Sequence, residues 1–216
     1  MSPVDVDVIG RRFARLATDA VMRQPRLWRL FRAPLRRQFD LLASSWETRI
    51  GPAHLDALRE ALEQVPPPGR ALDLGTGIGT AAVAVARRFP EAEVIGVDLS
   101  QAMVDVATAK LPDDLDGRVS YIVADASALP LPDASCQLVT LSNMIPFFAE
   151  LDRVLAQDGS VLVSFSGGPA TPIWVPPDVL RRELGRRGFT HFADFASGAA
   201  TCFAARRGEI DYGPDH

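Results

Sequence analysis

Residues 71–80 read ALDLGTGIGT, and this stretch decides how the rest of the chain is interpreted. A short apolar run contains the acid Asp73, and three glycines then follow at every second position, Gly75, Gly77 and Gly79. A glycine loop between a buried strand and a helix lets the backbone approach a ligand closely, and the free N–H groups at the helix start attract polar or negative groups. The stretch therefore predicts the first strand–loop–helix unit of an α/β fold, with a ligand at the loop.

Short apolar runs alternate with helical segments from residue 70 onward. The predicted strands are 70–74, 93–97, 119–123, 137–141, 160–165, 189–192 and 201–205, and the predicted helices between them are 80–89, 101–110, 150–156 and 178–188. This alternation is typical of a parallel sheet covered by helices. The last two apolar runs are joined by a link rich in Gly, Ala and Ser without a helix, which favours an antiparallel pair.

The first 65 residues are predicted to be helical. Apolar residues recur there at helical spacing, at Leu27, Trp28, Phe31, Leu35, Phe39 and Leu42. We expect Pro34 to kink or split this helix, and a second helix to run from Pro52 to Val65. The prolines that follow predict three parts of the chain, which are an amino-terminal helical cap at 1–66, an α/β domain at 67–208 and a tail at 209–216.

The composition limits which class of protein this chain can belong to. A chain of 216 residues with 47% apolar and 23% charged residues suits one ordinary globular domain with a helical extension. Cys136 and Cys202 lie far apart in apolar segments and no Cys/His cluster occurs, so we expect reduced core cysteines and no metal site. Asp5 and Asp7 stand where a signal peptide would be basic, and no apolar run approaches the roughly 20 residues that span a bilayer. We expect a cytoplasmic protein without an integral membrane segment.

Charge is distributed unevenly. The net charge is −4, yet residues 11–37 hold nine arginines and one acid, Asp19. A basic amphipathic helix suits anionic lipid, nucleic acid or an acidic substrate, and a solvated face is the simpler interpretation. Because no stacking aromatics interleave the arginines and the rest of the chain is acidic, we expect no nucleic-acid partner, while peripheral membrane contact stays open.

The spacing of the glycines separates two kinds of ligand. The dinucleotide fingerprint GxGxxG needs glycine at position 80, where this chain has Thr80, and Asp73 would repel a pyrophosphate. Residues 73–79 instead match the D/E-x-G-x-G-x-G motif, and here the chain resembles the class I S-adenosylmethionine-dependent methyltransferases. Their cofactor carries a cationic sulfonium and an ammonium group but no phosphate, so an acid near the loop attracts it. Asp73 therefore discriminates between the two kinds of ligand.

Two further acids extend the resemblance. Asp98 ends the apolar run 94–98, and a carboxylate there can accept both hydroxyl hydrogens of a ribose diol. The segment 123–133, VADASALPLPD, resembles the family's D-A-x-x-L-P-F-P-D segment, which implies that Asp125 takes the adenine amino group and that the next backbone N–H meets the ring. Gln137 replaces an acid that the family usually has in the next strand. The resemblance covers roughly residues 70–207.

The resemblance implies a doubly wound, seven-stranded, Rossmann-like sheet with the last strand antiparallel, preceded by the helical cap. It implies S-adenosylmethionine as cofactor. The predicted cofactor-binding residues are Asp73, Gly75, Thr76, Gly77, Gly79, Asp98, Leu99, Met103, Asp125, Ala126 and Ser142.

The methyl acceptor is predicted only by class. A small molecule is expected because no large extra domain is present to hold a macromolecule. The predicted acceptor-binding residues are Trp46, Asn143, Phe147 and Trp174, although aromatic residues at such positions more often pack in a core. Asn143 is a hypothesis for orienting the acceptor and Glu47 for removing a proton, whereas none of the three histidines is expected to face the pocket.

Two alternatives stay open on the sequence alone. The chain could be a binding module that holds an adenosyl ligand without catalysis and acts on a partner through its basic helix. It could also be a nicotinamide-dependent oxidoreductase, which predicts affinity for NAD. The identity of the acceptor, the atom that is methylated and the oligomeric state are not predicted.

Overall fold

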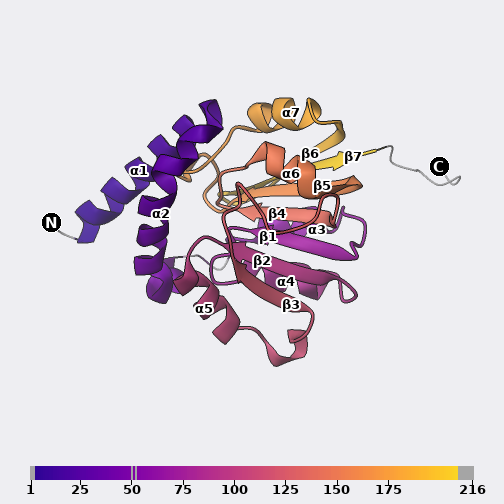
Figure 1. The fold of residues 1–216 in the computed structure, drawn as a ribbon, viewed down its shortest axis with the longest axis horizontal. Helices are drawn as coiled ribbons and strands as arrows, with labels where there is room; N and C mark the ends of the chain where they lie inside the picture. The colour runs from indigo at the N-terminus through magenta and orange to yellow at the C-terminus, as the bar shows by residue number, and fades with distance from the viewer. Residues whose placement is uncertain (1–2, 50, 52, 209–216) are drawn as a thin grey trace, which may run out of the picture.

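The computed structural model describes residues 3–49, 51 and 53–208, and the side chains from Ile9 onward within these ranges. A seven-stranded sheet forms the centre of the molecule (Figure 1). Its strands are β1 (Arg70–Leu74), β2 (Glu93–Asp98), β3 (Val119–Val123), β4 (Cys136–Ser142), β5 (Leu155–Phe165), β6 (Phe189–Ser197) and β7 (Ala200–Arg207).

The strands lie in the order β3-β2-β1-β4-β5-β7-β6. All neighbours are parallel except β7, which runs antiparallel between β5 and β6. The predicted seven-stranded sheet with an antiparallel last strand is therefore confirmed. The chain builds the sheet outward from β1 in one direction and then returns to add β4 on the other side. Such a switch of direction leaves a crevice at the carboxyl ends of the two central strands, where ligands bind in open α/β sheets.

Helices cover both faces of the sheet. They are α3 (Asp56–Leu62), α4 (Thr80–Arg88), α5 (Gln101–Ala109), α6 (Phe148–Val154) and α7 (Pro177–Gly185). One apolar cluster joins α3 and α4 to the sheet, and a second joins α6 and α7 to it from the other side. Strand residues such as Leu72 and Val139 are completely buried between these layers, which explains why the strands are short runs of Val, Ile, Leu and Ala.

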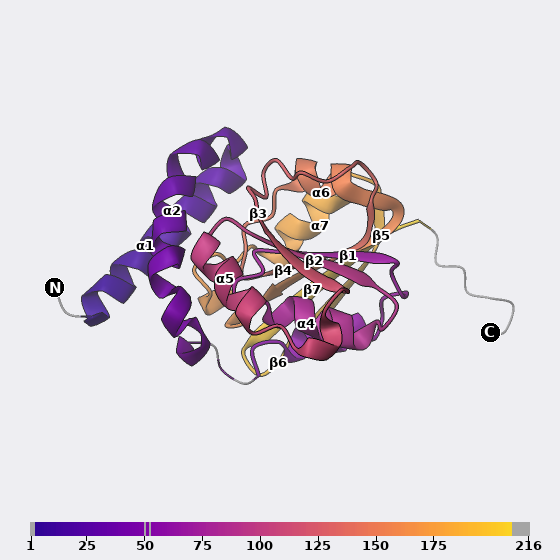
Figure 2. The same cartoon turned by 60° about the horizontal axis from the view of Figure 1, so that its bottom comes forward.

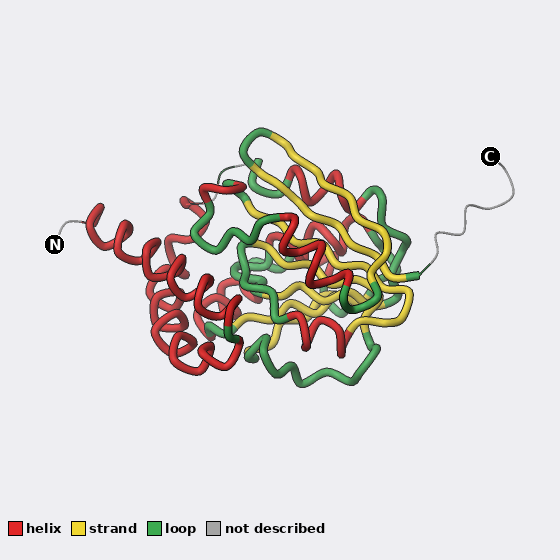
Figure 3. The backbone as a smooth tube through the Cα atoms, turned by 90° about the horizontal axis from the view of Figure 1, so that it is seen from above, coloured by secondary structure: helices red, strands yellow, loops and turns green. Residues whose placement is uncertain are grey.

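Two longer helices precede this core, α1 (Pro3–Arg23) and α2 (Trp28–Leu42). Figures 1, 2 and 3 show them gathered at one end of the sheet. Ala17, Val21, Trp28 and Leu35 are buried in the same apolar cluster as α6, α7 and the strands. The inner sides of α1 and α2 therefore share the core of the α/β domain. The division of the chain near residue 66 stays a prediction.

Three local expectations differ from the structure. α2 continues through Pro34, so the expected split is wrong, while the expected kink stays a prediction; both Pro34 and Leu30, whose carbonyl loses its helical partner, are exposed, so water can hydrate that carbonyl. The helix predicted from Pro52 is confined to α3, and Pro52 itself lies outside the described residues. β5 begins at Leu155 rather than residue 160: Leu155 pairs with Cys136 of β4, and the register shifts before Ser160 pairs with Leu138.

Cys136 and Cys202 are both buried and unpaired. Among the described residues, no helix combines the length and the apolar character needed to cross a bilayer.

Candidate active site

The glycine loop follows β1 at the centre of the sheet. Gly75, Gly77 and Gly79 all have positive φ, at 66°, 53° and 85°, a region that residues with a side chain adopt only with strain. A Cβ at Gly79 would meet the ring of Tyr121, with Cζ at 2.8 Å, and a Cβ at Gly75 would meet the Met144 side chain. Backbone conformation therefore favours glycine at all three positions, and close neighbouring side chains favour it further at Gly75 and Gly79.

Asp73 lies beneath this loop and is completely buried. Its carboxylate accepts hydrogen bonds from Thr76 Oγ1 at 2.7 Å and from Thr140 Oγ1 at 2.8 Å. Burial raises the pKa of Asp73 to about 6, against the opposing effect of these hydroxyls and of the Ala82 backbone N–H. Asp73 thus holds the loop to strands β1 and β4 from below. It is not part of the wall of the cavity described below.

Asp98 ends β2 and faces the loop. One carboxylate oxygen accepts the backbone N–H of Gly77 at 2.9 Å, and the other accepts that of Ser100 at 2.9 Å. Burial raises the pKa of Asp98, although these backbone hydrogen bonds work against it. A carboxylate has about four lone-pair sites, so Asp98 can take two further hydrogen bonds. It lines the cavity, and the geometry fits a diol between the loop and β2.

Asp125 has partners from the amino-terminal helix. Trp28 Nε1 donates to its carboxylate at 2.8 Å, Ser127 donates through its backbone and hydroxyl, and Arg32 lies at 3.4 Å. Burial favours the neutral acid, but these hydrogen bonds outweigh it and hold the pKa of Asp125 below its ordinary value. The predicted acceptor of the adenine amino group therefore already joins the loop after β3 to α2.

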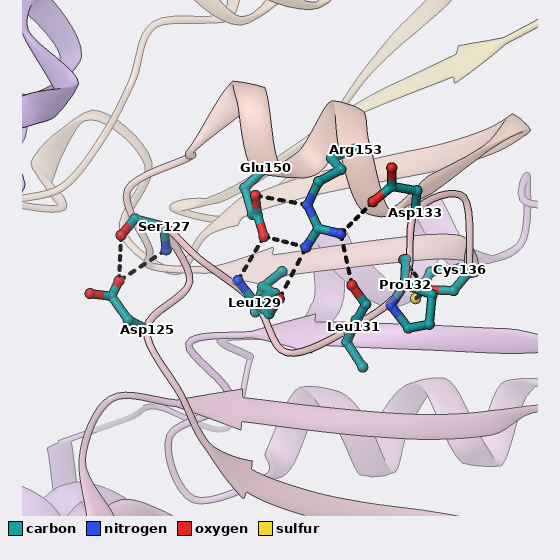
Figure 4. A network of polar contacts seen from close by, with 10 residues as sticks. Asp125, Ser127, Leu129, Leu131, Pro132, Asp133, Cys136, Glu150 and Arg153 are labelled. Atoms are coloured by element: carbon teal, nitrogen blue, oxygen red, sulfur yellow. Dashed lines mark hydrogen bonds and ion pairs between the residues drawn. The ribbon is translucent and has the colours of Figure 1, made fainter.

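The segment after Asp125 is fixed by α6 (Figure 4). Glu150 accepts the backbone N–H of Leu129 at 2.6 Å, and Arg153 donates to the carbonyls of Leu129 and Leu131 and to Asp133. Glu150 and Arg153 also pair with each other. These contacts of Glu150 and Arg153 were not predicted from the sequence. The signal that could have revealed them is the spacing of three residues between an acid and a base on one short helix.

A cavity of about 570 Å³ opens at this edge of the sheet. The glycine loop and the ends of β2 and β4 form its floor. The inner sides of α1 and α2 form its roof, through Ala14, Trp28, Leu35, Phe39 and Leu42 among others. The loop after β5 closes a third side through Thr171, Pro172 and Ile173.

Most of the predicted site residues lie in the wall of this cavity. These are Trp46, Gly75, Thr76, Gly77, Asp98, Leu99, Met103, Ala126, Ser142, Asn143 and Phe147. Four others do not line it. Asp73, Gly79 and Asp125 stand directly behind the wall, and Trp174 lines a separate hollow between β5, β7 and α7. The roles assigned to all of these residues stay predictions.

Glu47 also lies outside the cavity wall. Its carboxylate pairs with Lys110 Nζ on the surface, and 69% of its side chain is exposed. A proton acceptor should stand within hydrogen-bonding reach of the acceptor in the enclosed space. Glu47 therefore lacks the position that its hypothetical role requires.

His54 lines the cavity, contrary to the expectation that no histidine would face it. Its Nδ1 lies 2.7 Å from the carbonyl oxygen of Gly51, and its Nε2 lies 3.4 Å from Thr80 Oγ1. A carbonyl can only accept, so Nδ1 carries the proton and Nε2 keeps a lone pair when the ring is neutral. His54 precedes α3, and only the packing of α3 beside α4 brings it to the loop, which the sequence does not reveal.

Asn143 follows β4 with a positive φ of 52°, which asparagine tolerates better than most residues. Its side-chain amide donates to Ser166 Oγ at 3.0 Å, and its side-chain oxygen accepts the Ser166 backbone N–H at 2.9 Å. Asn143 and Ser166 both line the cavity, so this pair joins the ends of β4 and β5 on one side of it.

The residues present fit S-adenosylmethionine. The glycine loop exposes backbone without side chains, and Asp98 beside it can hold a ribose. Leu99, Met103 and Ala126 offer an apolar slot next to Asp98 for a flat base. The cavity volume lies within the range of small-molecule sites, roughly 300–1,000 Å³.

Comparisons with known proteins agree with this fit. A family model described as a methyltransferase domain matches residues 71–163. The ubiquinone/menaquinone biosynthesis C-methyltransferase UbiE of Syntrophotalea carbinolica is 35% identical over 112 residues, covering 49% of this chain and 47% of that protein. The malonyl-[acyl-carrier protein] O-methyltransferase of Halorhodospira halophila is 35% identical over 149 residues, covering 63% of this chain and 49% of that protein.

A solved structure, the S-adenosylmethionine-dependent methyltransferase of Aquifex aeolicus, superposes with a TM-score of 0.62. The aligned region covers 76% of this chain and 96% of the Aquifex aeolicus chain at 17% identity, so the comparison shows a shared fold. The chain spans about half the length of the curated relatives it matches. The matched segment contains the glycine loop, Asp98 and Asp125, so sequence, fold and site point the same way. Residues 71–163 of this chain therefore form a methyltransferase domain of the class I S-adenosylmethionine-dependent family.

Proposed function

We propose that this protein moves a methyl group to a small-molecule acceptor by direct displacement. When bound, S-adenosylmethionine supplies an electrophilic methyl carbon on its sulfonium. The observation that supports the proposal is the shared cavity, in which the glycine loop and Asp98 on the floor face the inner sides of α1 and α2. Such an enclosed space can align two molecules and exclude water, which together lower the barrier without a covalent intermediate.

The roof of the cavity supports a largely apolar acceptor. Leu35, Phe39 and Leu42 come from α2, while Phe147 and Ile173 come from the loops after β4 and β5. Asn143 is the polar group among them that could orient the acceptor, and Ser166 keeps its amide in place. The curated relatives include enzymes named for quinone biosynthesis and for an acyl-carrier protein, and neither name assigns an acceptor to this chain.

His54 is our candidate for receiving a proton when the acceptor carries one. His54 lines the cavity, and its Nε2 keeps a lone pair because Nδ1 donates to Gly51; Nε2 lies 3.4 Å from Thr80 Oγ1, which also belongs to the cavity wall. His54→Gln should lower kcat about 100-fold, in line with the usual contribution of a positioned base. His191→Gln, on the surface strand β6, is the matched control. Unchanged kcat in His54→Gln with a true acceptor would remove His54 from this role.

The proposed function is tested in two steps. Calorimetry with S-adenosylhomocysteine should show a single site, and no heat with the intact protein would overturn the proposal. Methyl-labelled cofactor is then incubated with cell extract fractionated by size, and label should move into a fraction of small molecules. Binding without any transfer would favour the non-catalytic module, and binding of NAD in place of the adenosyl ligand would favour an oxidoreductase.

A further inference from the structure

The outer sides of α1 and α2 expose an unusual amount of apolar surface. Four of the five large apolar side chains that the described residues expose lie on these two helices. They are Leu41, exposed at 82%, Leu30 at 69%, Leu16 at 60% and Ile9 at 54%. Single exposed leucines are ordinary on a protein surface, but their concentration on two neighbouring helices is a feature that needs a cause.

Helical spacing groups these residues. On α2, Leu30, Pro34, Arg37 and Leu41 are separated by four, three and four residues, so they form one outward stripe. The buried residues Trp28 and Leu35 lie on the opposite side of the same helix. Ile9 and Leu16 of α1 are seven residues apart and share a side as well. A surface helix normally has one apolar stripe, and α2 has two.

The arginines beside the outward stripe have no partner within the part of the chain that the structure describes. Neither ion pair, hydrogen bond nor ring contact is formed by the six exposed arginines Arg12, Arg23, Arg26, Arg29, Arg36 and Arg37. In the α/β domain most arginines are paired, as in Arg70 with Glu93 and Arg181 with Asp194. The positive charge of these six arginines is therefore left uncompensated within the described chain, whereas Arg32 of α2 pairs with Asp125.

We infer that the outer side of α1 and α2 docks on an anionic lipid bilayer. Aliphatic side chains inserted among the acyl chains and arginines placed at the headgroup phosphates are the two contributions that hold amphipathic helices in a membrane interface. Both are present on the same exposed stripe. Docking in this way keeps the helices parallel to the membrane plane and needs no segment that crosses it.

The observations favour lipid over the other partners of a basic surface. Nucleic acids are bound through stacking aromatics and phosphate contacts, and the aromatic side chains of α2, Trp28, Phe31 and Phe39, point into the core. Exposed leucines add nothing to such binding. A second copy of the chain would bring the same positive charge against this surface, which opposes self-association.

Vesicle co-sedimentation tests the inference on the full chain. Vesicles of phosphatidylcholine alone are compared with vesicles that contain an equal amount of phosphatidylglycerol, without any cofactor. We expect binding to the mixed vesicles that weakens steeply as salt is added, because screening removes the electrostatic part. Since no methyl transfer is involved, this result is independent of the proposed function, and failure of one leaves the other standing.

Surface variants separate the two contributions. Leu30→Gln with Leu41→Gln removes the aliphatic part, and Arg29→Gln with Arg36→Gln removes two charges; each pair should weaken vesicle affinity on the order of tenfold. The matched control is Arg182→Gln in α7 with Arg186→Gln, the residue that follows α7; both arginines are exposed and pair with Glu183. This control removes the same charge from another helix and should leave vesicle affinity unchanged. Thermal unfolding confirms that each variant is folded.

Five outcomes overturn the inference. The intact protein could ignore both kinds of vesicle, or bind both equally. The α7 control could weaken binding as much as the α2 variants. The protein could bind duplex RNA or DNA, but not vesicles, at the same salt concentration. It could also form a dimer, measured by light scattering, that is lost in Leu30→Gln with Leu41→Gln; the stripe would then be an interface between two copies of the chain.

Discussion

At the scale of single residues, Asp73 shows that an acid beside a glycine loop can have a structural role. Asp73 is surrounded by Thr76, Thr140 and the start of α4, and its two oxygens are occupied by hydroxyl donors. The loop keeps its shape because these bonds fix it from below, while Asp98 fixes it from the side through the Gly77 N–H. The negative charge of Asp73 can still act on a cationic ligand through the loop, at a distance and without contact.

Asp73→Asn is expected to flatten part of the pH dependence of stability. The folded pKa of about 6 lies above the ordinary value of 3.8, so between about pH 4 and pH 6 the folded protein binds more protons than the unfolded chain. The free energy of unfolding therefore falls as the pH rises through this window, by roughly 3 kcal/mol at most. Urea denaturation at several pH values measures this, and an unchanged slope in Asp73→Asn would contradict the raised pKa.

Trp28→Phe is expected to destabilise the protein by about 2 kcal/mol, because the indole N–H is a buried donor to the charged Asp125. Arg32→Gln is the control, since its ion pair with the same carboxylate is long and half exposed and contributes little. Denaturant titrations of both variants give the comparison. Equal losses would mean that the bond from Trp28 does not secure α2.

At the scale of elements, α2 shows that a proline need not end a helix on an exposed side. Pro34 lacks the N–H that would reach the carbonyl of Leu30, and it lies on the solvent side of α2. The inner side, with Leu35 buried at 5% exposure, is held by the core. Packing of the inner side of α2 therefore outweighs the tendency of Pro34, on the solvent side, to end the helix.

Pro34→Ala should stabilise the protein by about 1–2 kcal/mol. The substitution restores one helical hydrogen bond and removes a ring clash, and the gain is reduced by the greater freedom of alanine in the unfolded chain. Pro25→Ala is the control, because Pro25 begins a short 3-10 helix where a missing N–H costs nothing. Chemical denaturation should distinguish the two: Pro25→Ala should bring no gain, because only the freedom of the unfolded chain changes there, and an equal gain in both variants would contradict a cost specific to Pro34 in the helix.

The central strands were predictable from sequence because burial on both faces requires short apolar runs, as in β1. β3 lies at the sheet edge and is only partly buried, but its run Val119–Val123 is still rich in Val and Ile. The glycine loop was predictable for a similar reason, since its constraint is local. The partners of Asp125 were not predictable, because Trp28 is 97 residues away. The position of His54 at the cavity was not predictable either, since it depends on how α3 packs. Contacts between distant elements depend on tertiary packing that local patterns do not encode.

At the scale of the whole molecule, the cavity lies where the sheet changes its direction of growth and where the amino-terminal helices cover it. Floor and roof come from parts of the chain separated by tens of residues, and both contribute to the wall. A ligand that fills the cavity joins them. Binding should therefore raise the stability of the entire fold, since the unfolded chain has no such site.

S-adenosylhomocysteine at about 100 times its Kd should raise the Tm by roughly 5–10 °C, corresponding to about 2.7 kcal/mol for a protein of this size. Asp98→Ala should abolish most of this rise, because its carboxylate faces the cavity beside the loop. Asp105→Ala, which removes an exposed acid on α5, should keep it. Differential scanning calorimetry measures all three, and a full rise in Asp98→Ala would exclude Asp98 from the site.

The attachment of α1 to the loop after β5 has a consequence for how such a protein can change. Arg11 donates to the carbonyl of Ala170, and Arg15 donates to the carbonyls of Thr171 and Trp174. All of these acceptors are backbone carbonyl oxygens, which every amino acid has. Pro172 and Ile173 line the cavity between these anchor points. Substitutions of these two residues leave in place the backbone carbonyls that accept hydrogen bonds from Arg11 and Arg15. Mutation can therefore reshape this wall of the cavity while α1 stays attached to the loop.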